Sequence, residues 1–219
     1  MSAPLIPQVF WFRMALPCTR IDALPRSGRG RLLDLAPECA LPDFSRLEGH
    51  ASWAEVRVAW NPKGLGVSFE VTGKTGPIVS DPERPLASDG VQLWIDTRDT
   101  RNAHRATRFC HRFVATLAPG GRGVNVSQRA IGRAQADAPI ARPEAVLSRV
   151  DARKSGWLLE LFLNAEALHG FDPETNRRLG FAFQVTDPAR DDLYLSVGRE
   201  FPVAEDPSLW ATLELREPD

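Results

Sequence analysis

The chain has 219 residues, of which 43% are hydrophobic and 25% are charged. These proportions are typical of globular proteins and argue against a disordered or fibrous chain, and the length suits one β-sandwich or barrel better than two full domains. The 27 Lys and Arg residues nearly balance the 28 Asp and Glu residues, and a net charge of -1 argues against a global positive field that would attract nucleic acid or an anionic membrane.

The cysteines and the N-terminal residues indicate in which cellular compartment the protein is expected. Cys18, Cys39 and Cys110 are odd in number and lack CxxC spacing, so no disulfide framework is predicted. The apolar N-terminal run is broken by prolines and an arginine and has no early basic cluster, unlike a signal peptide. No stretch approaches the roughly 18 apolar residues that span a bilayer. We therefore expect a soluble, cytoplasmic protein, provided that the start site is correct.

The first quarter of the chain is the least periodic. Residues 9–14 (VFWFRM) form a short aromatic run between Pro7 and Pro17, which predicts an edge strand or a strand that crosses the mouth of a sandwich. The remainder of this part is polar and rich in turn residues. We expect residues 1–52 to be mainly an irregular segment that wraps around the core.

Alternating patterns begin after residue 52. Residues 55–60 and 66–71 alternate between apolar and polar side chains and flank the turn 61–64, which predicts a hairpin. Residues 72–88 are rich in Gly and Pro and predict a long loop, a type of segment that often binds ligands. The strand 91–96 (VQLWID) follows, with one buried face and one that is free to meet a ligand.

The rest of the chain continues in short strands with turn residues between them. Asn164 is expected to cap a short helical turn at 165–168. About ten strands and almost no helical periodicity predict an all-β fold, a single-domain antiparallel β-sandwich of immunoglobulin or jelly-roll type with its core in residues 53–217. The later predicted strands are 108–117, 123–127, 146–150, 157–163, 179–187, 193–197 and 209–215.

The order of these elements resembles the family-9-like carbohydrate-binding modules, within a wider group of sandwiches that includes the DOMON domains. The resemblance implies a noncatalytic module that binds a saccharide between two tryptophans, beside an acid on the strand 91–96. Here Gln92 occupies the position of that acid, and residues 84–87 (RPLA) occupy the position of one aromatic. The matching pieces are the hairpin 56–71, then 88–96 (SDGVQLWID), 109–117, 156–163 (GWLLELFL), 179–185 (LGFAFQV) and 209–213 (LWATL).

The strand 91–96 supplies the candidate ligand-binding residues. Sugar recognition needs flat apolar faces and planar polar groups, and alternation places such side chains on one face of this strand and of its expected neighbour. An alternative interpretation is that the tryptophan covers the second face of the sandwich under a loop and the arginines are solvated or paired. The candidates are Gln92, Trp94, Asp96, Arg108 and Arg112.

Metal or haem binding is less favoured by the pattern. Adjacent strand residues point to opposite faces, so Cys110 and His111 do not share one ion, and the EF-hand pattern is absent. A structural calcium ion near residues 96–99 remains an alternative, whereas no cofactor is favoured. Haem-binding DOMON relatives use a Met ligand, but this chain has only Met1 and Met14. The secondary metal candidates are Asp96, Asp99, His104 and His111.

The sequence contains none of the catalytic motifs that we sought. GxSxG, HExxH, the P-loop and a strand-to-helix GxGxxG are all absent, so we expect no enzyme activity. The favoured function is a noncatalytic module with a saccharide partner. The alternative is a protein-interaction or structural domain with arginine-rich docking loops, followed by a metal- or haem-dependent redox domain.

Overall fold

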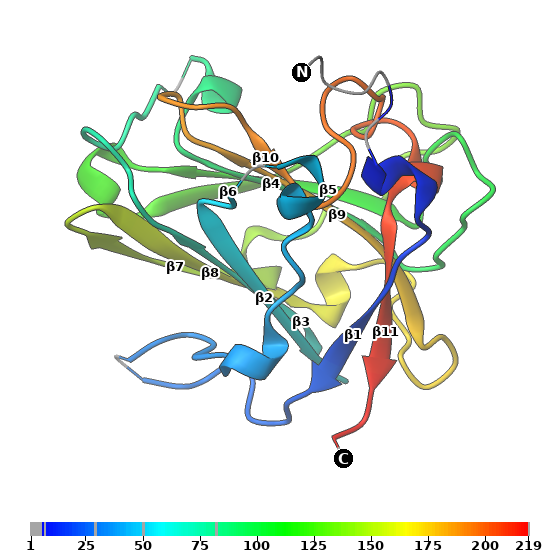
Figure 1. The fold of residues 1–219 in the computed structure, drawn as a ribbon. Coiled ribbons are helices and arrows are strands. Elements are labelled where there is room, and N and C mark those ends of the chain that lie inside the picture. Colours follow the sequence, from blue (N-terminus) through cyan, green and yellow to red (C-terminus); the bar gives the residue numbers. More distant parts are fainter. Residues whose placement is uncertain (1–5, 7, 29, 50, 82, 219) are drawn as a thin grey trace.

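A computed structural model describes residues 6, 8–28, 30–49, 51–81 and 83–218, and the strands among them all belong to one sheet (Figure 1). Short 3-10 helices connect them, and no α-helix occurs in this part of the chain. The strands are β1 (Ala15–Arg20), β2 (Ala54–Asn61), β3 (Gly64–Val71), β4 (Gly90–Asp96), β5 (Cys110–Leu117), β6 (Val124–Arg129), β7 (Val146–Arg153), β8 (Gly156–Asn164), β9 (Arg178–Thr186), β10 (Leu193–Tyr194) and β11 (Ala211–Arg216).

The sheet folds over on itself into a sandwich. Its strand order is β6-β5-β4-β9-β11-β1-β2-β3-β8-β7, and β10 pairs with β9 beyond the part of β9 that pairs with β11. The main core lies between the two halves, where Phe69 of β3 meets Phe183 of β9 with ring centroids 5.7 Å apart. Burying alternate side chains of both halves in this way drives a sheet to close over itself. The predicted all-β sandwich is confirmed.

The N-terminal segment differs from expectation. Residues 9–14 do not form a strand: a 3-10 helix spans Gln8–Trp11, and the chain becomes a strand only at β1. There Leu16 and Cys18 enter the core, while the aromatic residues before them remain exposed. β1 pairs in parallel with both β11 and β2, so it is also the exception to the predicted antiparallel pairing. Residues 1–52 are therefore not only a wrapping segment.

Other boundaries move by a few residues. β2 and β3 form the predicted hairpin in continuous register, and a side chain at Gly64 would collide with the carbonyl group of Leu163. The predicted strand at 193–197 shortens to β10. Asn164 does not cap the 3-10 helix Ala165–Ala167; its side-chain amide donates instead to the Ala145 carbonyl oxygen at 3.0 Å.

The outer face of β4, β5 and β9 is divided into two parts. One part holds a second apolar cluster in which Trp94, Cys110 and Ala182 pack under loops that carry Ile131 and Trp210. The other part carries polar side chains. This division leaves only the polar part of the outer face for contact with a ligand.

Candidate functional site

A line of hydrogen-bonded polar side chains crosses the outer face of the sheet from β5 to the loop after β9. Arg112 donates to Gln92 Oε1 from Nε at 3.1 Å and from Nη2 at 2.5 Å. Gln92 Nε2 donates to Gln184 Oε1 at 2.8 Å, and Gln184 Nε2 donates to Asp192 Oδ2 at 2.9 Å. We call these four residues the polar row.

Strand register holds the polar row in place. Gln92 lies directly opposite Gln184, and Trp94 lies directly opposite Arg112. Gln92 is only 7% exposed and is bonded at both ends, so its amide has a fixed orientation, whereas the other three side chains are partly exposed. The polar row therefore presents a preorganised line of planar donors and acceptors, the groups that take paired hydroxyls.

Arg112 lies above the ring of Trp94. The guanidinium carbon is 5.7 Å from the ring centroid, within the range of a cation–π interaction. Burial lowers the pKa of Arg112, and the nearby charge of Arg129 lowers it further. Arginine nevertheless stays protonated in proteins, so the row keeps a positive charge at this end.

Trp94 itself is completely buried. Its Nε1 has no hydrogen-bond partner among the described residues. The ring packs beneath Arg112 and within the second apolar cluster. This agrees with the interpretation that Trp94 covers the second face of the sandwich beneath loops. It is not a surface on which a sugar could stack from solvent.

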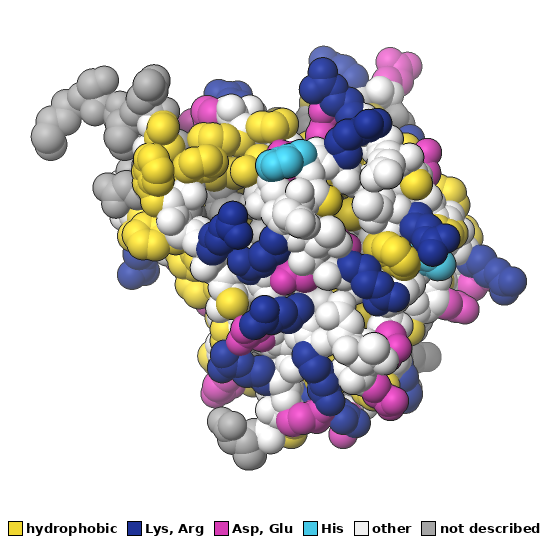
Figure 2. Space-filling model, turned by 90° about the vertical axis from the view of Figure 1, so that its right-hand side faces the viewer, with side chains coloured by type: hydrophobic (Ala, Val, Ile, Leu, Met, Phe, Trp, Pro, Cys, Tyr) yellow, Lys and Arg dark blue, Asp and Glu magenta, His cyan; other side chains and the backbone are white. Residues whose placement is uncertain are grey.

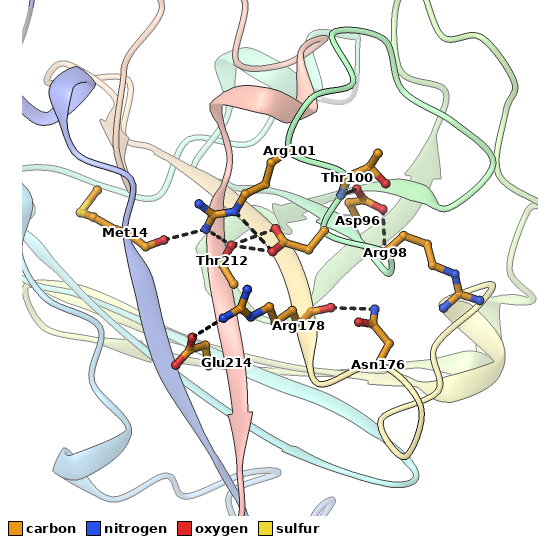
Figure 3. Close-up of polar contacts among 10 residues, drawn as sticks. Met14, Asp96, Arg98, Thr100, Arg101, Asn176, Arg178, Thr212 and Glu214 are labelled. Atoms are coloured by element: carbon orange, nitrogen blue, oxygen red, sulfur yellow. Dashed lines mark hydrogen bonds and ion pairs between the residues drawn. The ribbon is translucent and has the colours of Figure 1, made fainter.

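Asp96 and Arg108 lie away from the polar row. Asp96 is 1% exposed and accepts from the backbone N–H of Arg98 at 2.9 Å and of Thr100 at 2.7 Å, so it organises the loop after β4 (Figure 3). Arg108 is exposed, with its guanidinium carbon 5.1 Å from the ring centroid of Phe109. Of the five candidates, the structure brings together Gln92, Arg112 and, beneath them, Trp94.

Neighbouring polar contacts fix the same loop to β11. Asp99 accepts from the Thr212 hydroxyl at 2.8 and 2.9 Å and pairs with Arg101. Arg101 also donates to the carbonyl oxygen of Met14. The carboxylates of Asp96 and Asp99 are thus engaged with protein donors rather than arranged around a shared centre.

The secondary metal candidates do not converge. Within the described residues, no group of three or more His, Cys, Asp or Glu side chains could hold a metal ion. His104 is exposed, with its Nδ1 3.0 Å from Asp206 Oδ2. His111 is buried, with its Nε2 3.3 Å from the His169 carbonyl oxygen, and burial lowers its pKa to about 4.

A buried ion-pair network supports the loop that carries Asp192. Lys74 Nζ lies 2.9 Å from Asp89 Oδ1 and 2.8 Å from Asp187 Oδ1, and all three side chains are nearly inaccessible. Burial lowers the pKa of Lys74, but its hydrogen bonds to Asp187 and Asp89 outweigh this and leave the pKa raised. Arg190 binds the second oxygen of Asp187 at 2.7 Å. Lys74 therefore joins the loop at 72–88 to the turn after β9.

An aromatic cluster is exposed elsewhere on the surface (Figure 2). Phe10, Trp11 and Phe12 are 40%, 69% and 58% exposed, and Phe10 stacks on Phe201. Phe10 and Phe12 line a cleft of about 580 Å³ that also borders on His104. Exposed apolar surface of this kind is typical of interaction sites, and the protein-interaction alternative stays a prediction.

The sequence did not reveal Gln184 and Asp192 as members of the site. Alternation places Gln184 on the outer face of residues 179–187, beside Thr186, but it does not show which residue of a neighbouring strand Gln184 meets. The signal that could have found it is its place opposite Gln92, and this register depends on how β4 and β9 pair. Asp192 lies in a loop, where strand periodicity carries no information.

The chain was compared with protein-family models, curated proteins and solved structures, and only the last comparison finds similar proteins. No protein-family model matches the sequence, and no curated protein matches it. In the structure comparison, the chain is similar to a family-9 carbohydrate-binding module from Caldicellulosiruptor kristjanssonii in complex with cellotriose, with a TM-score of 0.56, 16% identity and 76% of each chain covered. The same module in complex with glucose gives the same TM-score, with 78% of that chain covered.

A second solved protein shares this fold. A putative carbohydrate-binding protein from Bacteroides uniformis matches with a TM-score of 0.50 and 14% identity, covering 74% of this chain and 78% of that one. Identities this low establish a common fold rather than a common ligand. The chain thus has a fold like that of the family-9 carbohydrate-binding modules.

Proposed function

We propose that this chain, with its family-9-like fold, is a noncatalytic module that binds a saccharide across the polar row. The observation that carries the proposal is the continuous path of hydrogen bonds from Arg112 to Asp192 on the polar, partly exposed part of the outer face. Such an array matches the paired hydroxyl groups of a sugar ring, each of which both donates and accepts. The ligands named for the similar structures support the choice of ligand class.

The binding is expected to be weak, because the site lacks exposed aromatic stacking at two places. Trp94 is buried, and the loop before β4 carries Leu86, which is 54% exposed, where the resemblance leads us to expect an aromatic. Stacking on aromatic faces contributes a large part of the energy in most sugar sites. A dissociation constant near 1 mM, or about −4 kcal/mol, is the affinity that we expect for a monosaccharide.

A cluster of Ser, His and Asp residues in another part of the surface supports a noncatalytic role. Ser208 Oγ lies 3.1 Å from Nδ1 of His104, and Asp206 Oδ2 lies 3.0 Å from the same nitrogen. A proton relay from serine through histidine requires the serine and the carboxylate on opposite ring nitrogens. This cluster does not have that arrangement.

Replacing Gln184 tests the proposal, because this residue joins the two halves of the polar row. We expect Gln184→Ala to weaken saccharide binding about tenfold, a loss of about 1.4 kcal/mol, measured by calorimetric or NMR titration. Gln135→Ala is the matched control, since Gln135 lies outside the polar row and its side chain makes no hydrogen bond among the described residues. Unchanged affinity in a folded Gln184→Ala protein would contradict the proposal.

A further inference from the structure

Arg112 differs from the other partly buried arginines of the described chain. Each of the other five has a carboxylate partner, whereas the guanidinium of Arg112 meets only uncharged groups, the amide oxygen of Gln92 and the ring of Trp94. Leaving a desolvated cation without a counter-ion is costly. The five that are paired are Arg20, Arg57, Arg101, Arg153 and Arg190.

A second arginine adds to this charge. Arg129 of β6 lies directly opposite Arg112, and its Nε donates to the Ser127 hydroxyl at 3.1 Å. No carboxylate of the described residues pairs with either guanidinium, and like charges on facing strand positions destabilise a sheet. This end of the polar row therefore has two positive charges and lacks a negative one.

The negative charge of the row lies at its other end. Asp192 is separated from Arg112 by the two glutamines and accepts a hydrogen bond from Gln184. Burial, with the adjacent charge of Asp192, raises the pKa of Tyr194 to about 12, so that Tyr194 stays neutral. The site is thus polarised along its length, positive at β5 and β6 and negative beyond β9.

We infer that the saccharide is an acidic one, a uronic acid whose carboxylate binds between Arg112 and Arg129 while its hydroxyls lie along the glutamines. This inference rests on the proposed function and specifies its ligand class. A carboxylate is planar and takes two parallel N–H donors of a guanidinium, which makes it a better partner for arginine than a hydroxyl. The ligand supplies the counter-ion that the described residues do not provide.

Titration with matched ligands tests the inference. The probes are the methyl glycosides of glucuronic and galacturonic acid, the neutral glucoside and galactoside, the methyl ester of the glucuronide, and glucose 6-sulfate. We expect one acidic glycoside to bind at least about tenfold more tightly than its neutral counterpart and its ester, with the preference reduced by salt. A sulfate preferred over both carboxylates would overturn the carboxylate assignment.

Two substitutions test whether Arg112 and Gln92 determine the preference for acidic over neutral glycosides. In Arg112→Gln, both affinities fall and the ratio of acidic to neutral binding falls to about one. In Gln92→Glu, a carboxylate of the chain replaces that of the ligand, and we expect the ratio of acidic to neutral binding to fall to about one or below, while neutral binding also weakens because the donor to Gln184 is lost. Arg149→Gln, which changes an exposed arginine on β7 that forms no ion pair with the described residues, is the control and keeps the wild-type ratio.

The outcomes separate this inference from the proposed function. Equal binding of acidic and neutral glycosides would overturn the inference and leave saccharide binding standing. A preference for acid that survives Arg112→Gln would also overturn it. Failure of every glycoside to bind would instead count against the proposed function itself.

Discussion

At the scale of single residues, one exchange of side chain decides the character of the site. The resemblance leads us to expect an acid at position 92, and a carboxylate there would neutralise Arg112 through the contacts that Gln92 now makes. Glutamine keeps the geometry of these contacts with Arg112 but carries no negative charge. The polar row is therefore well ordered and yet electrostatically incomplete.

Another single residue gives the protein a defined response to acid. His111 is 1% exposed, its ring stacks with Phe113, and burial lowers its pKa from 6.5 to about 4. Below pH 6.5 the unfolded chain binds a proton at this position that the folded chain does not bind until about pH 4. Stability from this group is thus complete above pH 6.5 and is lost as the pH falls toward 4.

Because His111 stays neutral in the folded protein, we expect the free energy of unfolding to fall by about 3 kcal/mol as the pH is lowered from 6.5 to 4. Urea unfolding followed by tryptophan fluorescence across this range measures the slope. His111→Gln should flatten it, whereas His104→Gln, at an exposed histidine, should not. A slope that is the same in all three proteins would contradict the assignment.

At the scale of elements, the loops on either side of the candidate site are anchored by buried charges as well as by apolar packing. Lys74, one of three lysines in the chain, connects the loop before β4 to the turn after β9. Because that turn leads to Asp192, the buried network also fixes one end of the polar row. A sequence pattern cannot show this, since Lys74 and Asp187 are 113 residues apart.

Removing the charge of Lys74 is expected to destabilise the protein strongly. Lys74→Met leaves Asp89 buried without a counter-ion, a change that costs about 3 to 5 kcal/mol when one partner of a buried pair is lost. Lys154→Met, at an exposed lysine in the turn between β7 and β8, should change the free energy of unfolding by less than about 0.5 kcal/mol. Chemical denaturation of both variants measures the difference, and equal stability would argue against a strong role for the network.

At the scale of the whole molecule, β1 joins the two halves of the sandwich. It lies between β11 and β2, and without it the sheet would have two further free edges. Leu16 and Cys18 of this strand are both buried in the main core. The N-terminal part of the chain therefore contributes to the stability of the whole sheet.

Truncating Leu16 tests this contribution. We expect Leu16→Ala to cost about 2 to 5 kcal/mol and to speed thiol labelling of Cys18, which is inaccessible in the native protein and whose pKa burial raises. Leu147→Ala, on the edge strand β7 and 36% exposed, serves as the matched control. Mass spectrometry locates the labelled thiol. Labelling of Cys18 at the wild-type rate would show that β1 is not held by this contact.

Local patterns predicted the elements better than their partners. Alternation identified the strands that became β2, β3 and β4, and parity correctly placed Cys110 and His111 on opposite faces, the first in the outer cluster and the second against Phe113. β1 was missed because Pro17 and a short run obscure its pattern, and because its stability comes from neighbours far away in sequence. The prediction of a strand at 9–14 is wrong, because an apolar run does not by itself specify where its side chains will be buried.

The sequence by itself determined that this chain forms an all-β sandwich, because a period of two in apolar side chains can be buried in few other ways. It also offered Gln92 and Arg112 as candidates, since alternation placed both on the outer face of their strands. Only the tertiary structure decided that Trp94 is covered and that Gln184 and Asp192 complete the polar row. These features depend on strand register and loop packing, which are set by contacts between residues distant in the chain.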